Sequence, residues 1–404
     1  MSIKYAILVG DGMSDYPIPE LGNKTPLEVA KIPNMNEIVK AGMIGLVKTV
    51  PPGMKPASDV ANLSILGYDP KLYYKGRGPL EAANIGIEIA EDEVAFRCNL
   101  VTVTNDIMAD YSAGHISEKE SKSLMEYLNK KLGNERIKFY HGTSYRNLMV
   151  IKTRSRDEIA DLIKTVCTPP HDISGKSVSK SLPNGRAADI LIKLMQDSIG
   201  LLERHEINKV RVDLKENPAN MIWIWGQGTN PNMPTFKGMF GIEGSVISAV
   251  DLVNGIGKLV GLEIIKVPGV TGYYDTNYQG KGEYAVSSLK KKDFVFVHVE
   301  APDEAGHNGD VRAKITAIEN FDKYVVGAVW KFLKESADDY RVMVLSDHAT
   351  PVSVRTHVSD PAPFVMAGSA VEHNGYGTFS ENNAKLSKVK FKSGYALTEK
   401  LIKA

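Results

Sequence analysis

The chain has 404 residues, of which 43% are hydrophobic and 24% are charged, a composition typical of a globular protein with a full core. This length suits two domains, or one domain with a large insertion. The 49 Lys and Arg residues nearly balance the 48 Asp and Glu residues, so no overall field favours nucleic acid or a membrane surface as a partner. The two cysteines, Cys98 and Cys167, form no disulfide framework and indicate a reducing, cytoplasmic location.

The N-terminal part predicts two strands and a short helix. The segment "YAILVGDGMSD" (5–15) is a buried-type strand that breaks at Gly10-Asp11-Gly12, and it is too short for a membrane helix. "LVKTV" (46–50) is the second predicted strand, and a Pro-rich turn then leads into a short helix near Ser58. "YDPKLYYKGRGP" (68–79) is rich in turn residues and is the first candidate linker.

The middle of the chain predicts an inserted α/β domain over residues 79–235. A capping box, Ser117 to Glu120, marks the start of its first helix. The Pro-rich segment 229–238 is the second candidate linker, so residues 1–78 and 236–404 form the predicted core domain. The predicted elements of the insertion are strands over 95–103, 147–153 and 219–228, and helices over 117–133, 155–166 and 187–208.

The C-terminal part continues the alternation of strands and helices. Strands are predicted over 263–269, 293–301 and 341–349, and a long helical stretch over 312–335 separates the last two. This order predicts an α/β fold with a mostly parallel sheet flanked by helices.

Acidic and histidine side chains follow several predicted strands at their carboxyl ends. Asp11, Asp303 and the pair Asp347-His348 each follow a strand, and the carboxyl ends of strands in such sheets meet along one edge. His307 lies four residues after Asp303, and His357 lies nine residues after His348. Carboxylate and imidazole ligands without cysteine suit Mn, Zn, Co or Fe, and six ligands exceed one tetrahedral site. The sequence therefore predicts two metal ions.

Two ions about 4 Å apart hold the attacking and leaving oxygens of a displacement at phosphorus. Ser58 opens a short helix whose N-terminus favours phosphate, which makes it the candidate nucleophile. Taken singly, a strand-end Asp is more often a turn residue and Ser58 more often a helix cap. The coincidence of such residues at separate strand ends favours the metal site.

Five motifs follow one another along the chain: "GDGMSD", "PASDVANLSILGYDP", "HVEAPDEAGHNGD", "LSDHATP" and "THVSDPAPF". Their order resembles the alkaline phosphatase superfamily, and more narrowly the archaeal-type 2,3-bisphosphoglycerate-independent phosphoglycerate mutases. The resemblance covers nearly the whole chain. It implies an alkaline phosphatase-like core, one metal held by Asp303, His307 and His357, and phosphorylation of Ser58 during turnover. It also implies a second metal held by Asp11, Ser58, Asp347 and His348.

The resemblance further implies an isomerase of glycolysis and gluconeogenesis that interconverts 3-phosphoglycerate and 2-phosphoglycerate. The implied cofactors are two divalent ions, with Mn favoured and Zn, Co or Mg as alternatives, and no 2,3-bisphosphoglycerate. The only implied partner is a small phosphorylated substrate, and the sequence does not decide between a monomer and a homo-oligomer.

The inserted domain is expected to act as a lid that binds the substrate carboxylate with cationic side chains. The better-known bacterial branch has an Arg-rich lid motif where this chain reads "IWIWGQGTNP", so the individual contacts are left open. The candidates for substrate binding are His115, Arg146, His171, Lys281 and Arg97.

Three alternatives remain from the residues alone. The same two-metal site serves phosphohydrolases and phosphodiesterases, and a phosphopentomutase-like enzyme would share the core with a different cap. A metal-binding protein without catalysis would have no need of Ser58 beside a full set of ligands.

Overall fold

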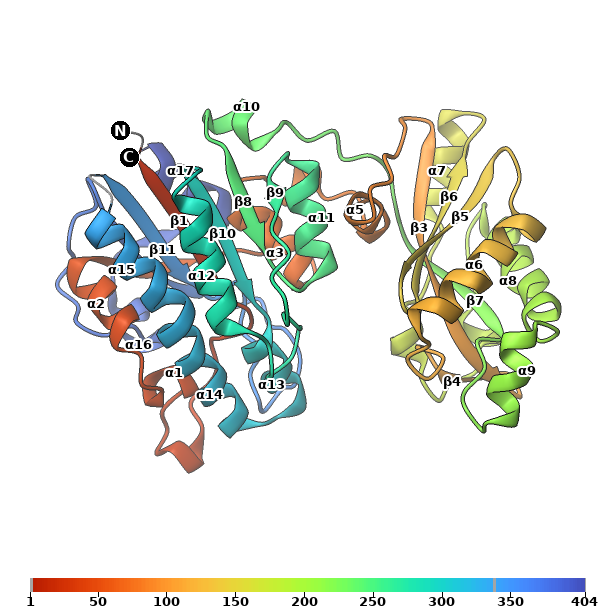
Figure 1. Ribbon diagram of the computed structural model, residues 1–404, viewed down its shortest axis with the longest axis horizontal. Coiled ribbons are helices and arrows are strands. Elements are labelled where there is room, and N and C mark those ends of the chain that lie inside the picture. The colour runs from red at the N-terminus through yellow and green to blue at the C-terminus, as the bar shows by residue number, and fades with distance from the viewer. Residues whose placement is uncertain (1–2, 337–338, 404) are drawn as a thin grey trace. The chain divides into compact units, whose positions relative to one another are not determined.

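The computed structural model describes residues 3–336 and 339–403. The chain divides into a core unit, which runs up to Tyr74 and resumes at Met233, and an inserted unit, Lys75–Asn232 (Figure 1). The predicted boundaries at 79 and 235 lie a few residues downstream of these, and the role of the inserted unit as a lid stays a prediction.

The core unit is built on an eight-stranded sheet with the order β13-β2-β12-β11-β1-β10-β8-β9. In its centre β1 pairs in parallel with β10 and β11, whereas β12 runs antiparallel to both of its neighbours. The mostly parallel sheet that the sequence predicts is thus confirmed. Its strands are β1 (Lys4–Gly10), β2 (Gly42–Val47), β8 (Gly244–Ile247), β9 (Glu263–Ile264), β10 (Phe294–Val299), β11 (Tyr340–Leu345), β12 (Ala362–Gly368) and β13 (Lys390–Phe391).

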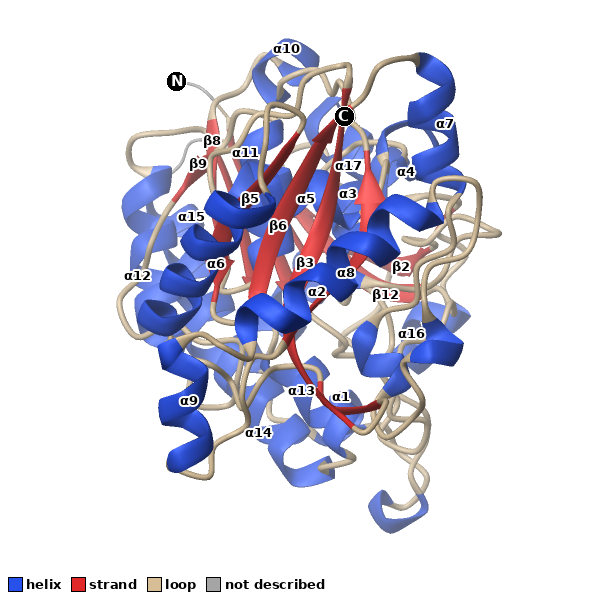
Figure 2. Cartoon of the chain, turned by 90° about the vertical axis from the view of Figure 1, so that its right-hand side faces the viewer, coloured by secondary structure: helices blue, strands red, loops and turns tan. Residues whose placement is uncertain are grey.

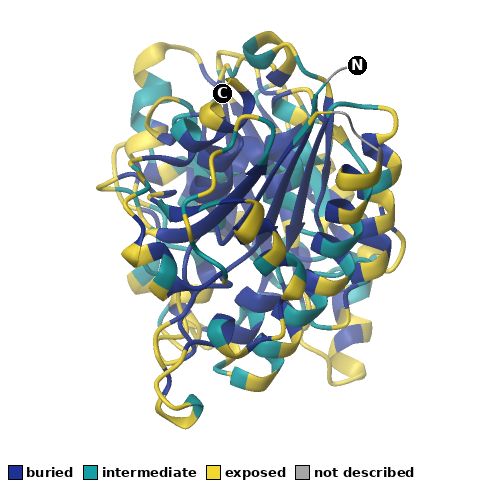
Figure 3. Ribbon diagram, turned by 90° about the vertical axis from the view of Figure 1, so that its left-hand side faces the viewer, coloured by how far each residue is buried: buried dark blue, intermediate teal, exposed yellow. Residues whose placement is uncertain are grey.

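Helices cover both faces of this sheet, so its central strands β1 and β10 are almost entirely buried (Figure 3). On one face Ala6 and Leu8 pack in a cluster with α2, α12 and α15, and on the other the Tyr5 hydroxyl donates to Ile402 O in α17. The core helices are α1 (Pro26–Val29), α2 (Pro33–Ala41), α3 (Ser58–Ile65), α4 (Pro70–Tyr73), α10 (Phe236–Phe240), α11 (Asp251–Leu259), α12 (Tyr278–Leu289), α13 (Ala301–Asn308), α14 (Val311–Asn320), α15 (Gly327–Ser336), α16 (Glu381–Leu386) and α17 (Gly394–Lys403).

Two predicted helices differ in detail from the structure. The stretch 312–335 is helical throughout but contains a π-helical turn, Phe321–Val326, between α14 and α15. The predicted helix 187–208 is two helices, α8 (Ala188–Leu202) and α9 (Glu206–Asp213), because His205 caps the second one by accepting a hydrogen bond from the Ile207 amide. Among the described residues, no helix has the length and apolar character needed to cross a membrane.

The inserted unit is an α/β domain, as the sequence predicts, and its sheet is antiparallel. β3 pairs with β4, β6 and β7, and β6 also pairs with β5. Helices α6 and α8 cover one face (Figure 2), and α5 packs on the other. The elements are α5 (Arg77–Asn84), β3 (Glu93–Thr104), β4 (Ile107–Asp110), α6 (Glu118–Leu132), β5 (Ile137–Thr143), β6 (Arg146–Lys152), α7 (Arg156–Lys164), α8 (Ala188–Leu202), α9 (Glu206–Asp213) and β7 (Met221–Gly228).

Candidate metal centre

The carboxyl ends of three adjacent parallel strands carry the acidic side chains of the candidate site. Asp11 follows β1, Asp303 lies just beyond β10, and Asp347 follows β11. The Asp11 amide donates to Val299 O at 2.9 Å, which joins the first two strand ends. The seven residues that the sequence predicted as metal ligands all belong to the core unit, and the structure brings them together.

The first group of candidate ligands contains Asp303, His307 and His357. Asp303 and His307 share one face of α13, with 3.2 Å between Asp303 Oδ2 and His307 Nε2, and His357 Nε2 lies 2.9 Å from His307 Nε2. The Nδ1 atoms of the two histidines lie 3.0 Å from Arg355 O and 3.4 Å from Pro56 O, respectively. Because a carbonyl only accepts, each Nδ1 donates its proton to that oxygen. The two Nε2 atoms are left to face Asp303 and one another, and a shared cation bound there would take the place of any proton on them.

The second group of candidate ligands surrounds Nε2 of His348. Ser58 Oγ lies 3.1 Å from this nitrogen, Asp11 Oδ1 3.4 Å and Asp347 Oδ2 3.6 Å. Ser58 is the first residue of α3, so its hydroxyl sits at a helix N-terminus, as the sequence predicted. The donor atoms of Asp11, Asp347 and His348 lie within 4.8 Å of one another, and so do those of Asp303, His348 and His357.

Hydrogen bonds from three segments hold the Asp347 carboxylate. Oδ1 accepts from the Gly12 amide at 3.1 Å and from the His348 amide at 2.8 Å, and Oδ2 accepts from Asn62 Nδ2 at 2.9 Å. Asn62 also donates to Ser58 O at 2.9 Å, one helical turn earlier. It therefore couples the candidate nucleophile to a candidate ligand. The spacing of four residues from Ser58 is the signal that could have singled it out.

The electrostatics of this cluster favour bound cations. Asp11 is fully buried, and neither of its carboxylate oxygens accepts a hydrogen bond from a described residue. Burial, together with the charges of Asp347 and Asp303, raises the pKa of Asp11 well above its ordinary value. Burial would also raise the pKa of Asp303, but His307 and His357 hold it well below its usual range. The hydrogen bond to Asp303 raises the pKa of His307 to about 9, so a proton on Nε2 occupies the place beside Asp303 that a bound cation would take. The donor set therefore fits divalent metal ions.

His298 lies beside this site but was not predicted from the sequence. Its Nε2 is 3.1 Å from Asp11 Oδ2, and burial lowers the pKa of the imidazole to about 4. A single histidine in the apolar run "FVFVHV" is the sequence signal for it. Lys281, predicted with the lid cations, instead lies fully buried in α12 of the core unit and donates to His298 O at 2.7 Å. The prediction that Lys281 is one of the lid cations is therefore wrong, because the residue is buried in the core unit.

The other predicted cations gather on one face of the inserted sheet, around aromatic rings. Arg97 lies opposite Trp225 in the ladder, with its guanidinium 4.3 Å from the ring centroid. The Arg146 guanidinium lies 4.8 Å from the Tyr145 ring, and the His171 ring 5.4 Å from Trp225. Cross-strand partners point to the same face, which explains why residues so distant in sequence meet. The predicted residues in this cluster are His115, Arg97, Arg146 and His171.

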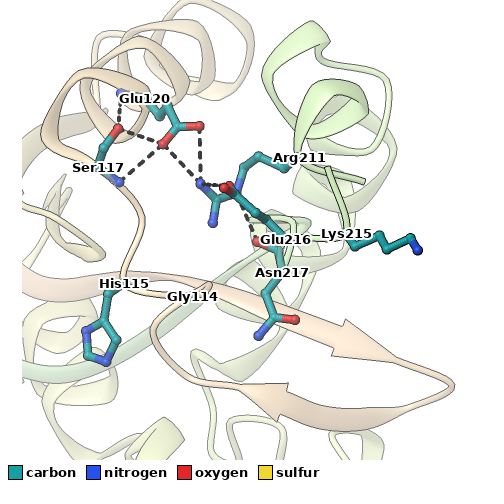
Figure 4. A pocket seen from close by; sticks show the side chains of 8 residues that line it. All are labelled: Gly114, His115, Ser117, Glu120, Arg211, Lys215, Glu216 and Asn217. Atoms are coloured by element: carbon teal, nitrogen blue, oxygen red, sulfur yellow. Dashed lines mark hydrogen bonds and ion pairs between the residues drawn. The ribbon is translucent and has the colours of Figure 1, made fainter. Parts of the chain in front are cut away.

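His115 joins the cluster through Tyr145, with 5.9 Å between the ring centroids. It also lines a cavity of about 460 Å³, but its ring points away from the ion pairs that Arg211 makes with Glu120 and Glu216 there (Figure 4). Burial lowers the pKa of Arg97, whose Nε lies 3.0 Å from Glu81 Oε1.

Comparison with known proteins gives consistent results. A family model described as 2,3-bisphosphoglycerate-independent phosphoglycerate mutase matches residues 39–208. The enzyme of that name from Methanothrix thermoacetophila is 51% identical over 98% of this chain and 97% of its own length. A solved structure of a Pyrococcus horikoshii protein is 29% identical with a TM-score of 0.83, covering 100% of this chain and 97% of its own. The cofactor-independent phosphoglycerate mutase from Thermoplasma acidophilum is 25% identical with a TM-score of 0.68, covering 100% and 99%.

Proposed function

Because this chain belongs to the family of 2,3-bisphosphoglycerate-independent phosphoglycerate mutases, we propose that it interconverts 3-phosphoglycerate and 2-phosphoglycerate through a phosphoserine at Ser58. The reaction is an intramolecular phosphate transfer that needs two divalent ions, with Mn favoured, and no bisphosphoglycerate. The observation that carries the proposal is the 51% identity to a named mutase over 98% of the chain. The convergence of Ser58 with the carboxylate and imidazole ligands supports it.

The residues of the core unit would perform the transfer. The Ser58 oxygen attacks phosphorus, the ester bond to glycerate breaks, and the hydroxyl proton of Ser58 passes to the glycerate oxygen that leaves. The second half of the cycle reverses these bonds with the other glycerate hydroxyl. The amides at the N-terminus of α3 favour phosphate at this position. Asp303, His307 and His357 would hold one ion, and Asp11, Ser58, Asp347 and His348 the other. When bound, the ions would stabilise the charge that develops on the phosphate oxygens.

The cationic and aromatic cluster of the inserted unit would bind the glycerate carboxylate. Arg146 is the stronger candidate because its side chain is exposed, whereas Arg97 is buried and already paired with Glu81. A guanidinium matches a carboxylate with two parallel hydrogen bonds. The position of the Arg146 guanidinium over the Tyr145 ring would hold its N–H donors in one orientation.

The test is to incubate the purified chain with Mn²⁺ and 3-phosphoglycerate, without bisphosphoglycerate, and to follow 2-phosphoglycerate and free phosphate. Isomerisation without phosphate release is the expected result. Release of phosphate alone would place the chain among two-metal phosphohydrolases, and isomerisation of a pentose phosphate instead would make it phosphopentomutase-like.

A further inference from the structure

Thr350 lies at the centre of the metal site without belonging to either group of predicted ligands. It follows His348 by two residues and is fully buried. Its main-chain oxygen accepts a hydrogen bond at 2.8 Å from the ammonium of Lys314, a fully buried lysine of α14. Lys314 also donates to Asp15 Oδ2 at 2.7 Å and to Ser14 O at 3.3 Å. The loop after β11 is thereby tied to the loop after β1.

The Thr350 hydroxyl contacts a predicted ligand of each ion. It donates to Asp303 Oδ1, and its oxygen lies 3.3 Å from His348 Nδ1. A hydroxyl has one proton, and the carboxylate takes it, so toward His348 the oxygen can only accept. Nδ1 of His348 must then carry the ring proton. Its Nε2 consequently presents a lone pair toward Ser58 Oγ at 3.1 Å and Asp11 Oδ1 at 3.4 Å.

The glycines of two motifs leave the space that Thr350 fills. A Cβ on Gly12 would lie 2.6 Å from Thr350 Oγ1, and a Cβ on Gly306 would lie 2.3 Å from Thr350 O and 2.9 Å from its Cγ2. Gly12 follows Asp11, and Gly306 precedes His307. Thr350 is therefore wedged between the segments that carry ligands of both predicted ions.

We propose that Thr350 is a positioning residue that couples the two metal subsites by orienting Asp303 and fixing the tautomer of His348. The inference rests on the proposed function for the identity of the ligands. It predicts that the hydroxyl sets metal affinity, although Thr350 itself binds no metal. Hydrogen-bond partners of metal ligands typically change metal affinity or activity by about 10- to 100-fold when they are removed.

The experiment measures Mn²⁺ binding to the full-length, metal-stripped chain by titration calorimetry. Thr350→Val removes the hydroxyl and keeps the shape, and Thr350→Ser keeps the hydroxyl. Thr398→Val is the matched control, because Thr398 is equally buried in the core unit and its hydroxyl donates to Ile65 O. Thr350→Ala takes the place of the valine variant if circular dichroism shows that the latter does not fold.

Thr350→Val is expected to weaken Mn²⁺ binding by about 10- to 100-fold, with Thr350→Ser and Thr398→Val both close to wild type. Wild-type affinity in a folded variant without the hydroxyl overturns the proposal. Equal weakening of Mn²⁺ binding in Thr350→Ser or Thr398→Val also overturns it, because it would indicate a general structural effect. A wild-type chain that binds no Mn²⁺ overturns it as well. A wild-type chain that binds Mn²⁺ without mutase turnover would count against the proposed function alone.

Discussion

Replacement of Gly12 by alanine tests the packing that places Asp303 beside Asp11. Gly12 has a φ of 57°, and a Cβ there would lie 2.5 Å from Asp303 Oδ1, 2.6 Å from Thr350 Oγ1 and 2.8 Å from Asp303 Cα. The left-handed conformation costs alanine about 1–2 kcal/mol. Displacing the crowded atoms adds about 1–3 kcal/mol, the usual cost of overpacking. Gly12→Ala should therefore lower the free energy of unfolding by about 2–5 kcal/mol and weaken Mn²⁺ binding through the shift of Asp303.

Gly22→Ala is the control that separates the two costs. Gly22 has a φ of 67°, and a Cβ there meets no atom within 4 Å, so only the conformational cost of about 1–2 kcal/mol applies. Both variants are unfolded in urea with circular dichroism as the probe, and Mn²⁺ binding is measured by calorimetry. Equal losses of stability, with wild-type Mn²⁺ affinity in Gly12→Ala, would refute the reasoning.

Three further predictions concern the ligands, the inserted unit and the response to pH. His357→Ala should leave one tightly bound Mn²⁺ per chain, and two tight ions by calorimetry would contradict its assignment. Arg146→Ala and His115→Ala should lower kcat/KM for 3-phosphoglycerate by about 10- to 100-fold, the worth of one charge-assisted hydrogen bond, with Mn²⁺ binding unchanged. Unaltered kinetics would exclude these residues from the substrate site. Burial raises the pKa of Glu381 from 4.5 to about 7, so the native state holds a proton that the unfolded chain releases. That stabilisation is present below pH 4.5 and is lost as pH rises through about 7. The free energy of unfolding of the wild type should therefore fall across this window relative to that of Glu381→Gln. Parallel pH profiles of the two proteins would contradict this.

The positions of the central strands could be predicted because apolar residues run through them without interruption. The segments that form β1, β10 and β11 are buried on both faces, and an acidic residue lies within two positions after the end of each strand. Since parallel strands present their carboxyl ends together, the convergence of Asp11, Asp303 and Asp347 followed from sequence order. The expectation of a sheet flanked by helices rested on the same signal.

Strand direction and local helix geometry could not be predicted in the same way. β12 has no counterpart among the predicted strands, and the antiparallel order of the inserted sheet depends on pairings between distant segments. The residues after β10 form α13, so Asp303 and His307 meet as neighbours one helical turn apart.

Residues that act through long-range contacts left the weakest sequence signals. Thr350 and Lys314 contact each other across 36 positions of the chain, and Asn62 reaches Asp347 across 285. Trp225 meets Arg97 only because of the register in which β7 pairs with β3. A shift of one residue in that register would turn the Trp225 ring to the opposite face of the sheet. The cationic residues of the inserted unit could therefore be predicted one by one. The aromatic residues that they contact could not.

The most direct test of the central claim is to look for phosphate on Ser58. The chain is mixed with Mn²⁺ and 3-phosphoglycerate, quenched in acid during turnover, digested, and its peptides are sequenced by mass spectrometry. Phosphate on Ser58 is the predicted result, together with loss of both the phosphopeptide and isomerisation in Ser58→Ala while the fold is retained. Rapid isomerisation with no phosphate on Ser58, or near-normal turnover in Ser58→Ala, would contradict the phosphoserine mechanism.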